Sequence, residues 1–246
     1  MATLVSFQLN RLTLNFFILF ILFIIVAFLK EKQRVFVWIT IAYFFGEFLH
    51  LYANRFLNEM NLNVHTVYIM EKLLLLFPIM SILYVSYKFK QNISFFYNKD
   101  FLSDSFSILQ DASNSRKRPI LLLSIILSLS LLILLLAFHN ISFVGHVLVF
   151  ASLSSMIEEF LWRGLLMQAM LNLTNKWTVM ILSSISYGCS YLMYGYSIGV
   201  CLLFACSGIL YAWMTLHFHH LFPAIVCHFL IFIIMIACGI VPFSPI

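Results

Sequence analysis

The chain has 246 residues and a net charge of +5, and 63% of its residues are hydrophobic while only 9% are Asp, Glu, Lys or Arg. A soluble domain carries about 25% charged residues, so this composition excludes a soluble or disordered protein and predicts an integral, multi-pass membrane protein. Nucleic-acid binding is not expected either, because the basic residues lie mostly in short connections, where orientation in the bilayer explains them.

Long apolar runs divide the sequence into about eight predicted membrane helices. A helical span needs roughly 20 mostly apolar residues, and these runs have that length without the alternating polarity of a transmembrane β-barrel. The predicted fold class is therefore all-α, a polytopic transmembrane helical bundle. In chain order, the predicted spans cover residues 12–29, 35–52, 67–87, 120–138, 141–157 with a continuation to about 171, 177–194, 198–216 and 221–241.

The stretch 88–118 is the only long polar segment of the sequence. We expect a three-span N-terminal segment at 1–87, a cytoplasmic loop at 88–118 and a functional core at 119–246. Ten Lys and Arg residues lie in connections on the side of this loop, whereas only Arg11 and Arg55 lie on the other side. The positive-inside rule therefore predicts that both termini lie outside the cytoplasm. The expected location is the plasma (inner) membrane or the endoplasmic reticulum membrane, depending on the organism.

Few ionisable side chains lie inside the apolar runs, and each is a candidate for function because a charge at the bilayer centre costs roughly 2.5–3.5 kcal/mol on insertion scales. Glu47 and His50 are three residues apart on one helical face, so we expect a structural polar contact between them. Glu71 and Lys72 lie near the start of the third predicted span and are expected at the membrane interface. His228, in the last predicted span, is typical of a buried structural histidine when it is taken alone.

The run 157–164 is different, because it places two adjacent carboxylates and an arginine inside one apolar helix. Glu159 and Arg163 are four residues apart, so they share a helical face and can pair. Glu158 points about 100° away from Glu159, by the period of the helix. A carboxylate that faces a polar cavity can act as a general base or acid, and His228 is its natural partner. The alternative is an interhelical polar clamp without catalysis.

These residues resemble the signatures of the CAAX-protease and bacteriocin-processing family, also called the CPBP or Abi family of intramembrane proteases. Glu158, Glu159 and Arg163, with a glycine following, match its first signature, Glu-Glu-x-x-x-Arg. The stretch 208–228, which passes through Leu-Phe-Pro-Ala and ends at a histidine, resembles its last signature. The resemblance covers about residues 120–241 and implies a helical protease core in the membrane.

Three positions depart from the family pattern, one of them mildly. In the middle signature, Phe-x-x-x-His, Tyr187 stands for the phenylalanine, which is the mild change, and Tyr191 stands for the histidine. Four residues after His228, where the family has Asn or Asp, this chain has Phe232. The phenol of Tyr191 keeps a hydrogen-bond donor, whereas the ring of Phe232 has none.

The resemblance implies an endopeptidase that hydrolyses a peptide bond of a membrane-associated substrate, with prenylated CAAX-type peptides among the candidates. Glu158 would activate water, Glu159 with Arg163 would orient groups and balance charge, and His228 with Tyr191 would donate hydrogen bonds to the developing oxyanion. In a metal-dependent version, Glu158 and His228 are the ligands that remain for a divalent ion such as zinc. No cofactor is therefore favoured, and the expected partners are the lipid bilayer and a membrane-associated or lipidated peptide.

Two other functions stay open at this stage. The substitutions at Tyr191 and Phe232 favour a non-catalytic relative, a membrane binding or immunity-type protein that keeps the fold. A proton-coupled transporter that uses Glu47, Glu158 and Glu159 would need inverted repeats, and we find none in the sequence.

Overall fold

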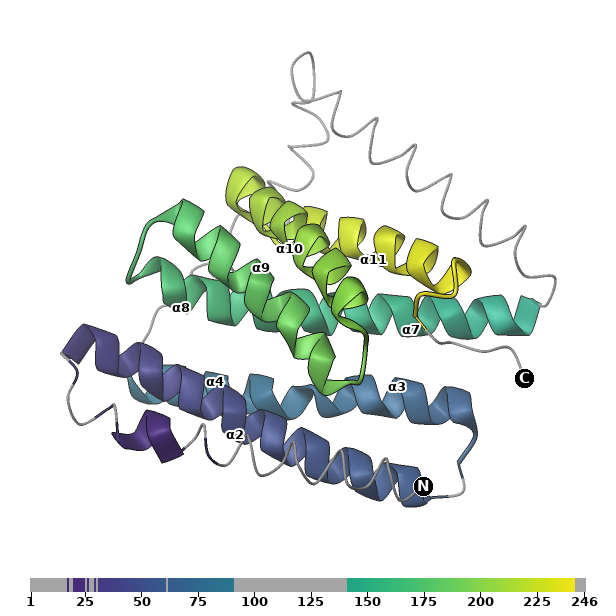
Figure 1. Ribbon diagram of the computed structural model, residues 1–246, viewed down its shortest axis with the longest axis horizontal. Helices are drawn as coiled ribbons and strands as arrows, with labels where there is room; N and C mark the ends of the chain where they lie inside the picture. Colours follow the sequence, from purple (N-terminus) through teal and green to yellow (C-terminus); the bar gives the residue numbers. More distant parts are fainter. Residues whose placement is uncertain are drawn as a thin grey trace, which may run out of the picture.

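The computed structural model describes residues 17, 20–24, 26, 29, 31–60, 62–90 and 141–241. Throughout this part of the chain the elements are helices, and short turns connect them (Figure 1). The all-helical fold class predicted from the sequence is confirmed. The predicted span 12–29 is described only in part, and the predicted span 120–138 and residues 91–118 of the predicted loop lie outside the described residues.

Three helices of the N-terminal segment form one layer of the bundle (Figure 1). They are α2 (Glu31–Glu59), α3 (Val64–Leu74) and α4 (Leu76–Lys88). α3 and α4 follow one path alongside α2, as the predicted span 67–87 requires, and this path is interrupted only at Leu75. Pro78 explains the interruption, because it has no N–H to donate to the carbonyl of Leu74.

The second part of the described chain begins with a long helical path. α7 (Ile141–Glu159) continues as a π-helix, η2 (Phe160–Leu166), which passes into α8 (Met167–Leu171). The predicted continuation of the fifth span to about residue 171 is therefore confirmed, with a widened helical turn directly after the two adjacent carboxylates. Such π-helical turns inside longer helices occur frequently at functional sites.

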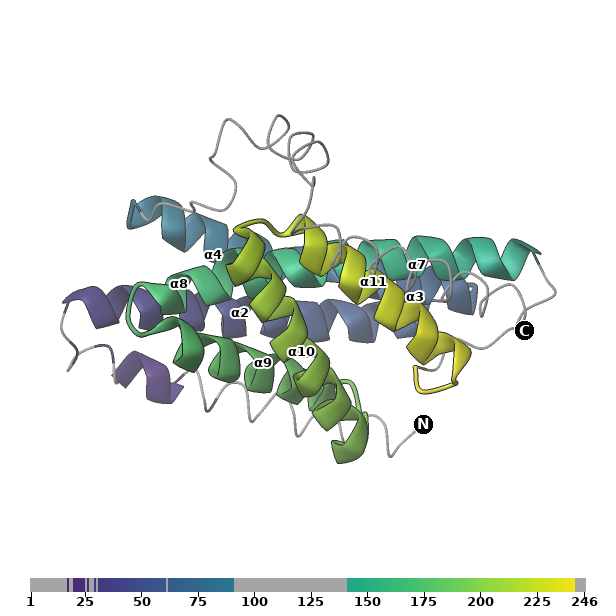
Figure 2. The ribbon, with the colours of Figure 1, turned by 90° about the horizontal axis from the view of Figure 1, so that it is seen from above.

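Three further helices follow in the described part of the chain: α9 (Lys176–Met193), α10 (Ile198–Phe218) and α11 (Phe222–Ala237). Asn175 and Ser197 are the N-caps of α9 and α10, and each side chain accepts a hydrogen bond from a backbone N–H of the first turn. α10 packs against both α9 and α11, and α11 also packs against α7 (Figure 2). This packing brings α7, α9 and α11 to one place.

Among the described residues, four helical paths are long and apolar enough to cross a membrane. They are Gln33–Glu59, Thr66–Lys88, Phe143–Leu171 and Ile198–Phe218, and α11 adds a shorter apolar helix. Large apolar side chains such as Met80, Tyr84 and Leu202 are more than 60% exposed. In water such a surface would favour aggregation, whereas lipid covers it without cost, so the protein is a polytopic membrane protein.

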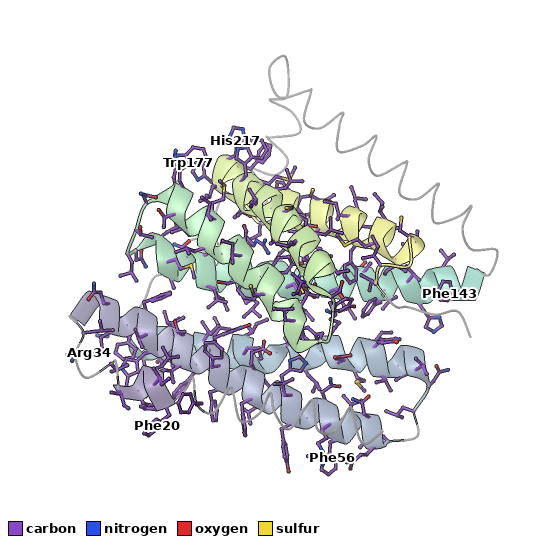
Figure 3. The ribbon with its side chains drawn as sticks, in the orientation of Figure 1. Phe20, Arg34, Phe56, Phe143, Trp177 and His217 are labelled. Atoms are coloured by element: carbon purple, nitrogen blue, oxygen red, sulfur yellow. The ribbon has the colours of Figure 1, made fainter. Side chains whose placement is uncertain are left out.

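The two ends of the bundle differ in the connections they carry. Figure 3 places Arg34 and Trp177 toward one end of the bundle, and Phe56 and Phe143 toward the other. The first end also carries the end of α4. These are the connections that the sequence predicts on the cytoplasmic side.

Gly188 allows α9 to approach α10 closely. A Cβ at this position would lie 2.5 Å from the carbonyl oxygen of Cys201 and 2.6 Å from the Cβ of Ala205. These atoms belong to the α10 backbone or are attached directly to it, so they cannot move aside without shifting the helix. The contact matters beyond stability, because α9 also carries Tyr187 and Tyr191.

We expect Gly188→Ala to lower the unfolding free energy by about 1–3 kcal/mol, because it overpacks the α9–α10 contact. Thermal unfolding in detergent measures the effect as a lower midpoint. Gly199→Ala is the matched control, since a Cβ there meets nothing within 4 Å and it lies on α10 itself. Equal midpoints for the two variants would contradict the close approach at Gly188.

Candidate active site

Glu158, near the end of α7, is held by hydrogen bonds at both of its carboxylate oxygens. The ammonium of Lys72, on α3, donates to Oε1 at 2.6 Å. The hydroxyl of Tyr191, on α9, donates to Oε2 at 2.6 Å. The Glu158 residue is only 4% exposed, so these contacts form away from bulk water. Charged hydrogen bonds of this length in a site of low dielectric are strong, and they fix the carboxylate in one orientation.

Glu159, the neighbouring carboxylate, belongs to a second buried cluster. Its Oε1 accepts from Nη1 of Arg163 at 3.1 Å, which confirms the predicted pairing of these two residues. The same oxygen lies 2.9 Å from Nδ1 of His228 on α11. Arg163 also donates through Nη2 to the carbonyl of Gly208 on α10 at 3.0 Å. The guanidinium therefore ties α7, η2 and α10 together around Glu159.

Tyr187 lies between the two clusters. Its hydroxyl is 3.2 Å from Oε2 of Glu158, 3.3 Å from the hydroxyl of Tyr191 and 3.2 Å from Nε2 of His228. Tyr187 is one helical turn before Tyr191, so both phenols leave the same face of α9. The two carboxylates, His228 and the two tyrosines thus form one continuous hydrogen-bonded network.

Aromatic packing holds the side chains of this network in place. The imidazole of His228 stacks on the ring of Tyr211 with centroids 4.8 Å apart, and Tyr191 stacks on Phe204 at 3.7 Å. The guanidinium of Arg163 lies over the ring of Tyr187 at 4.5 Å. These contacts restrict rotation of the functional groups and offset part of the cost of burying the arginine.

A cavity of about 470 Å³ lies beside the network. Lys72, Tyr191 and Phe232 contribute to its wall at the side of Glu158, and the other lining residues are mostly aromatic or small. Burial raises the pKa of Tyr196, which lies in the connection between α9 and α10 and lines the cavity, and nearby carboxylates add to the effect. Its hydroxyl therefore stays neutral and can donate a hydrogen bond to a ligand.

A second, much smaller cavity of about 10 Å³ adjoins Glu158 itself. Its lining is mostly apolar and includes the polar residues Glu47 of α2 and Tyr191. About 10–15 Å³ of this kind of volume is enough for one water molecule. The predicted contact between Glu47 and His50 is confirmed, with Nδ1 of His50 3.3 Å from Oε2 of Glu47. Glu47 also lies beside the site, through this small cavity.

The donor set of the site does not fit a divalent metal ion. Within the described residues, no group of three His, Cys, Asp or Glu side chains is arranged to hold one. Glu158 uses one oxygen for Lys72 and the other for Tyr191, while Nδ1 of His228 faces Glu159. The ammonium of Lys72 would also repel a cation bound at Glu158. We therefore derive no step through the zinc-type ion that the family resemblance left open.

The comparison with known families agrees with the sequence motifs. Residues 140–234 match the family described as type II CAAX prenyl endopeptidase Rce1-like. No curated protein and no solved structure matches the chain. The matched region begins at α7 and extends into α11, so it contains the Glu-Glu-x-x-x-Arg run and His228. This part of the chain is therefore similar to the CAAX-protease family, a family of proteases.

The structure brings together all five residues predicted for the site and adds two that the sequence did not assign to it. The five are Glu158, Glu159, Arg163, Tyr191 and His228. Lys72 was expected at the membrane interface and not in the site, but its ammonium pairs with Glu158 and its side chain is only 12% exposed. Tyr187 was interpreted as a mild replacement of phenylalanine, yet its hydroxyl lies at the centre of the network. The cost of a lysine inside an apolar run was the available signal for Lys72.

We expect Arg163→Gln to lower the unfolding free energy by about 3–5 kcal/mol, because it leaves the carboxylate of Glu159 buried without its cation. The matched control is Arg55→Gln, which breaks an exposed pair of the same spacing, with Arg55 and Glu59 4.0 Å apart. That variant is expected to change stability by less than about 1 kcal/mol. The thermal unfolding midpoints of both variants are measured in detergent and compared with that of the wild type. An equally small decrease of the midpoint in Arg163→Gln and Arg55→Gln would contradict the buried charge cluster.

Proposed function

We propose that the protein is a membrane-embedded endopeptidase that hydrolyses a peptide bond of a membrane-associated substrate. The observation that carries the proposal is the buried carboxylate of Glu158, which is oriented by Lys72 and Tyr191, two residues that line a cavity of about 470 Å³. An oriented carboxylate next to a partly polar cavity is the arrangement that general-base activation of water requires. The match of residues 140–234 to a protease family supports the same reaction.

In this proposal, Glu158 removes a proton from a water molecule, and the resulting hydroxide adds to the carbonyl carbon of the scissile bond. The cavity of about 10 Å³ next to Glu158 has room for such a water. The ammonium of Lys72 keeps further N–H donors for the oxyanion, and the hydroxyl of Tyr191 can turn to the oxyanion once Glu158 is protonated; both residues line the large cavity. Glu159 and Arg163 balance the charge behind this region.

The proposed substrate class is a membrane-associated peptide, with prenylated CAAX-type peptides as the first candidates. The cavity is lined by rings such as Tyr68, Phe150 and Tyr194, which suit an apolar or lipidated segment. Lys72 contributes the positive charge of this wall, and it lies outside the region matched to the family.

A second candidate function is a non-catalytic membrane binding or immunity-type protein of the same fold. The observation that favours it is that both oxygens of Glu158 are already engaged, and that neither Glu158 nor His228 lies among the residues lining the large cavity. In that case the polar network would stabilise the fold, and the cavity would bind a ligand without cleaving it. Replacement of Glu158 by glutamine would then leave function unchanged.

We expect wild-type protein to cleave membrane peptides from a panel of prenylated and unlipidated sequences, and Glu158→Gln to lose at least about 10²-fold in rate. The loss follows because an amide cannot accept the proton of water. Cleavage is measured by mass spectrometry of the products, with and without a chelator, and we expect resistance to the chelator. Glu59→Gln, which changes an exposed carboxylate on α2, is the control for the removal of a negative charge.

The variant Tyr191→His is assayed on the same peptide panel. Activity in Tyr191→His together with silence of the wild type would favour the non-catalytic function, because it would show that restoring the family histidine restores the enzyme. Silence of all three proteins would favour it as well, and equal activity of wild type and Glu158→Gln would reject Glu158 as the base.

We also propose that both termini lie outside the cytoplasm, on the basis of the positive-inside rule. The large cavity is lined by the turn after α9 and by residues just after α11, at the end of the bundle opposite to Arg34 (Figure 3). The cavity would then open toward the non-cytoplasmic face.

In right-side-out vesicles, we expect Cys238, an exposed residue directly after α11, to react with a membrane-impermeant maleimide. The protein tested carries Cys238 as its only cysteine, and mass spectrometry measures the labelling. The control is a variant in which all five native cysteines are replaced and Lys176→Cys supplies the only thiol. Residue 176 lies at the opposite end of the bundle, so this variant should react only in inside-out vesicles. The reverse pattern would overturn the orientation.

A further inference from the structure

His228 does not reach the reaction space directly. Its residue is 1% exposed, it is not among the residues lining either cavity, and its Nε2 is 3.8 Å from Oε2 of Glu158, which is too far for a hydrogen bond. The hydroxyl of Tyr187 fills this gap, since it lies 3.2 Å from Oε2 of Glu158 and 3.2 Å from Nε2 of His228. Among the described residues, the hydroxyl of Tyr187 is the group that connects the histidine to Glu158.

We infer that the hydroxyl of Tyr187 relays a proton between Glu158 and His228 during peptide hydrolysis. The inference rests on the proposed peptidase function and names a residue that this function alone does not require. Phenylalanine, the residue of the family pattern at this position, would pack in the same space and leave the two groups unconnected. In this chain the relay accompanies the replacement of the family histidine by Tyr191.

The state of His228 follows from its partner at Nδ1. A carboxylate only accepts, so Nδ1–H donates to Oε1 of Glu159 at 2.9 Å, and in the neutral imidazole Nε2 is then the acceptor. Nε2 faces the hydroxyl of Tyr187, which can donate to it. Glu159 also stabilises the imidazolium that forms when Nε2 takes up a proton, as a buried carboxylate does for a catalytic histidine in hydrolases.

The charged and titratable groups around His228 come from every helix packed against it. They are Glu158 and Glu159 of α7, Arg163 of η2 through its bond to Glu159, Tyr187 of α9, Tyr211 of α10 stacked on the ring, and Lys72 of α3 through its bond to Glu158. Among the described residues, Lys72 pairs with Glu158 and Arg163 pairs with Glu159, so each carboxylate of this set has a basic partner.

The proton of the attacking water moves in two steps. In the first step, Glu158 takes this proton as the oxygen of the water bonds to the carbonyl carbon, which leaves a protonated carboxyl and a tetrahedral oxyanion. The carboxyl proton then passes to the oxygen of Tyr187, while the hydroxyl proton of Tyr187 passes to Nε2 of His228. Before the carbon–nitrogen bond breaks, the same path runs in reverse, and Glu158 delivers the proton to the leaving nitrogen, which keeps the electron pair of the broken bond.

Tyr187→Phe tests the relay, because it removes only the hydroxyl and keeps the ring under the guanidinium of Arg163. We expect the rate constant for cleavage to fall about tenfold or more at an unchanged thermal unfolding midpoint. His228→Gln should give a similar loss. The double variant should be no slower than either single variant, because both changes interrupt one path, whereas independent roles would multiply the two losses.

The pH dependence separates a relay from a structural role. In the Tyr187→Phe background, adding His228→Gln should leave the pH–rate profile unchanged, whereas in wild type the same change should alter its acidic limb. Losses that multiply, or a profile in Tyr187→Phe that still depends on His228, would overturn the relay. A faster Tyr187→Phe protein would also overturn it, since the hydroxyl would then be blocking the site of the attacking water.

A spectroscopic measurement examines the contact without any substrate. Histidine labelled with ¹⁵N in detergent-solubilised protein gives a signal for His228, assigned by its loss in His228→Gln. We expect its Nε2 chemical shift to change in Tyr187→Phe and to stay unchanged in Tyr84→Phe, a control on the exposed face of α4. If the His228 signal is the same in wild type and in Tyr187→Phe, the relay is overturned. If the signal differs but the wild-type protein cleaves no peptide, the contact exists and the peptidase function and the relay step are rejected together.

Discussion

The burial of two adjacent carboxylates within one membrane helix is the constraint on which the rest of this structure depends. A lone charge in that position is costly, so each carboxylate needs a cation and further donors from other helices. Lys72 reaches Glu158 from the N-terminal segment, and Arg163 reaches Glu159 from the next turn of the same helical path. His228 donates a further hydrogen bond to Glu159, and the phenol of Tyr191 on α9 donates one to Glu158. The cluster therefore ties the N-terminal helices to the C-terminal ones.

The helix packing makes this convergence possible. A side chain at Gly208 would place its Cβ 3.1 Å from both Nη2 of Arg163 and the ring of Tyr187, so the close approach of the arginine to the α10 backbone depends on a glycine at this position. The π-helical turn of η2 begins directly after Glu159 and carries Arg163. A buried aromatic set that includes Tyr211 and Phe204 then encloses the polar groups. The polar side chains are thus surrounded by aromatic rings that exclude bulk water. The low dielectric that results strengthens each electrostatic contact.

The structure shows which contacts are made by the three residues that differ from the family pattern, Tyr187, Tyr191 and Phe232. Tyr191 replaces a histidine and keeps a hydrogen bond to Glu158, and Tyr187 adds a hydroxyl that joins Glu158 to His228. Phe232 replaces an amide or carboxylate and instead lines the large cavity, where it packs on Phe150 with centroids 5.6 Å apart. The site has therefore exchanged imidazole and amide groups for phenols and an aromatic wall while it has kept the charged motif of the family.

The sequence by itself determined the membrane class, the helical fold and the charged motif, because these follow from local properties: apolar runs of span length, and two residues four apart that share a helical face. Glu158, Glu159 and Arg163 were identified in this way, with His228 as their candidate partner, whereas Tyr191 was identified only through the resemblance to the CAAX-protease family. Lys72 and the hydroxyl of Tyr187 were not assigned to the site, since a lysine near the start of a predicted span also suits the interface, and a phenol in place of a phenyl ring looks conservative. Only the tertiary structure decided their roles, because the crossing of α3, α7, α9 and α11 sets which side chains, 29 to 86 residues apart, reach the same carboxylate.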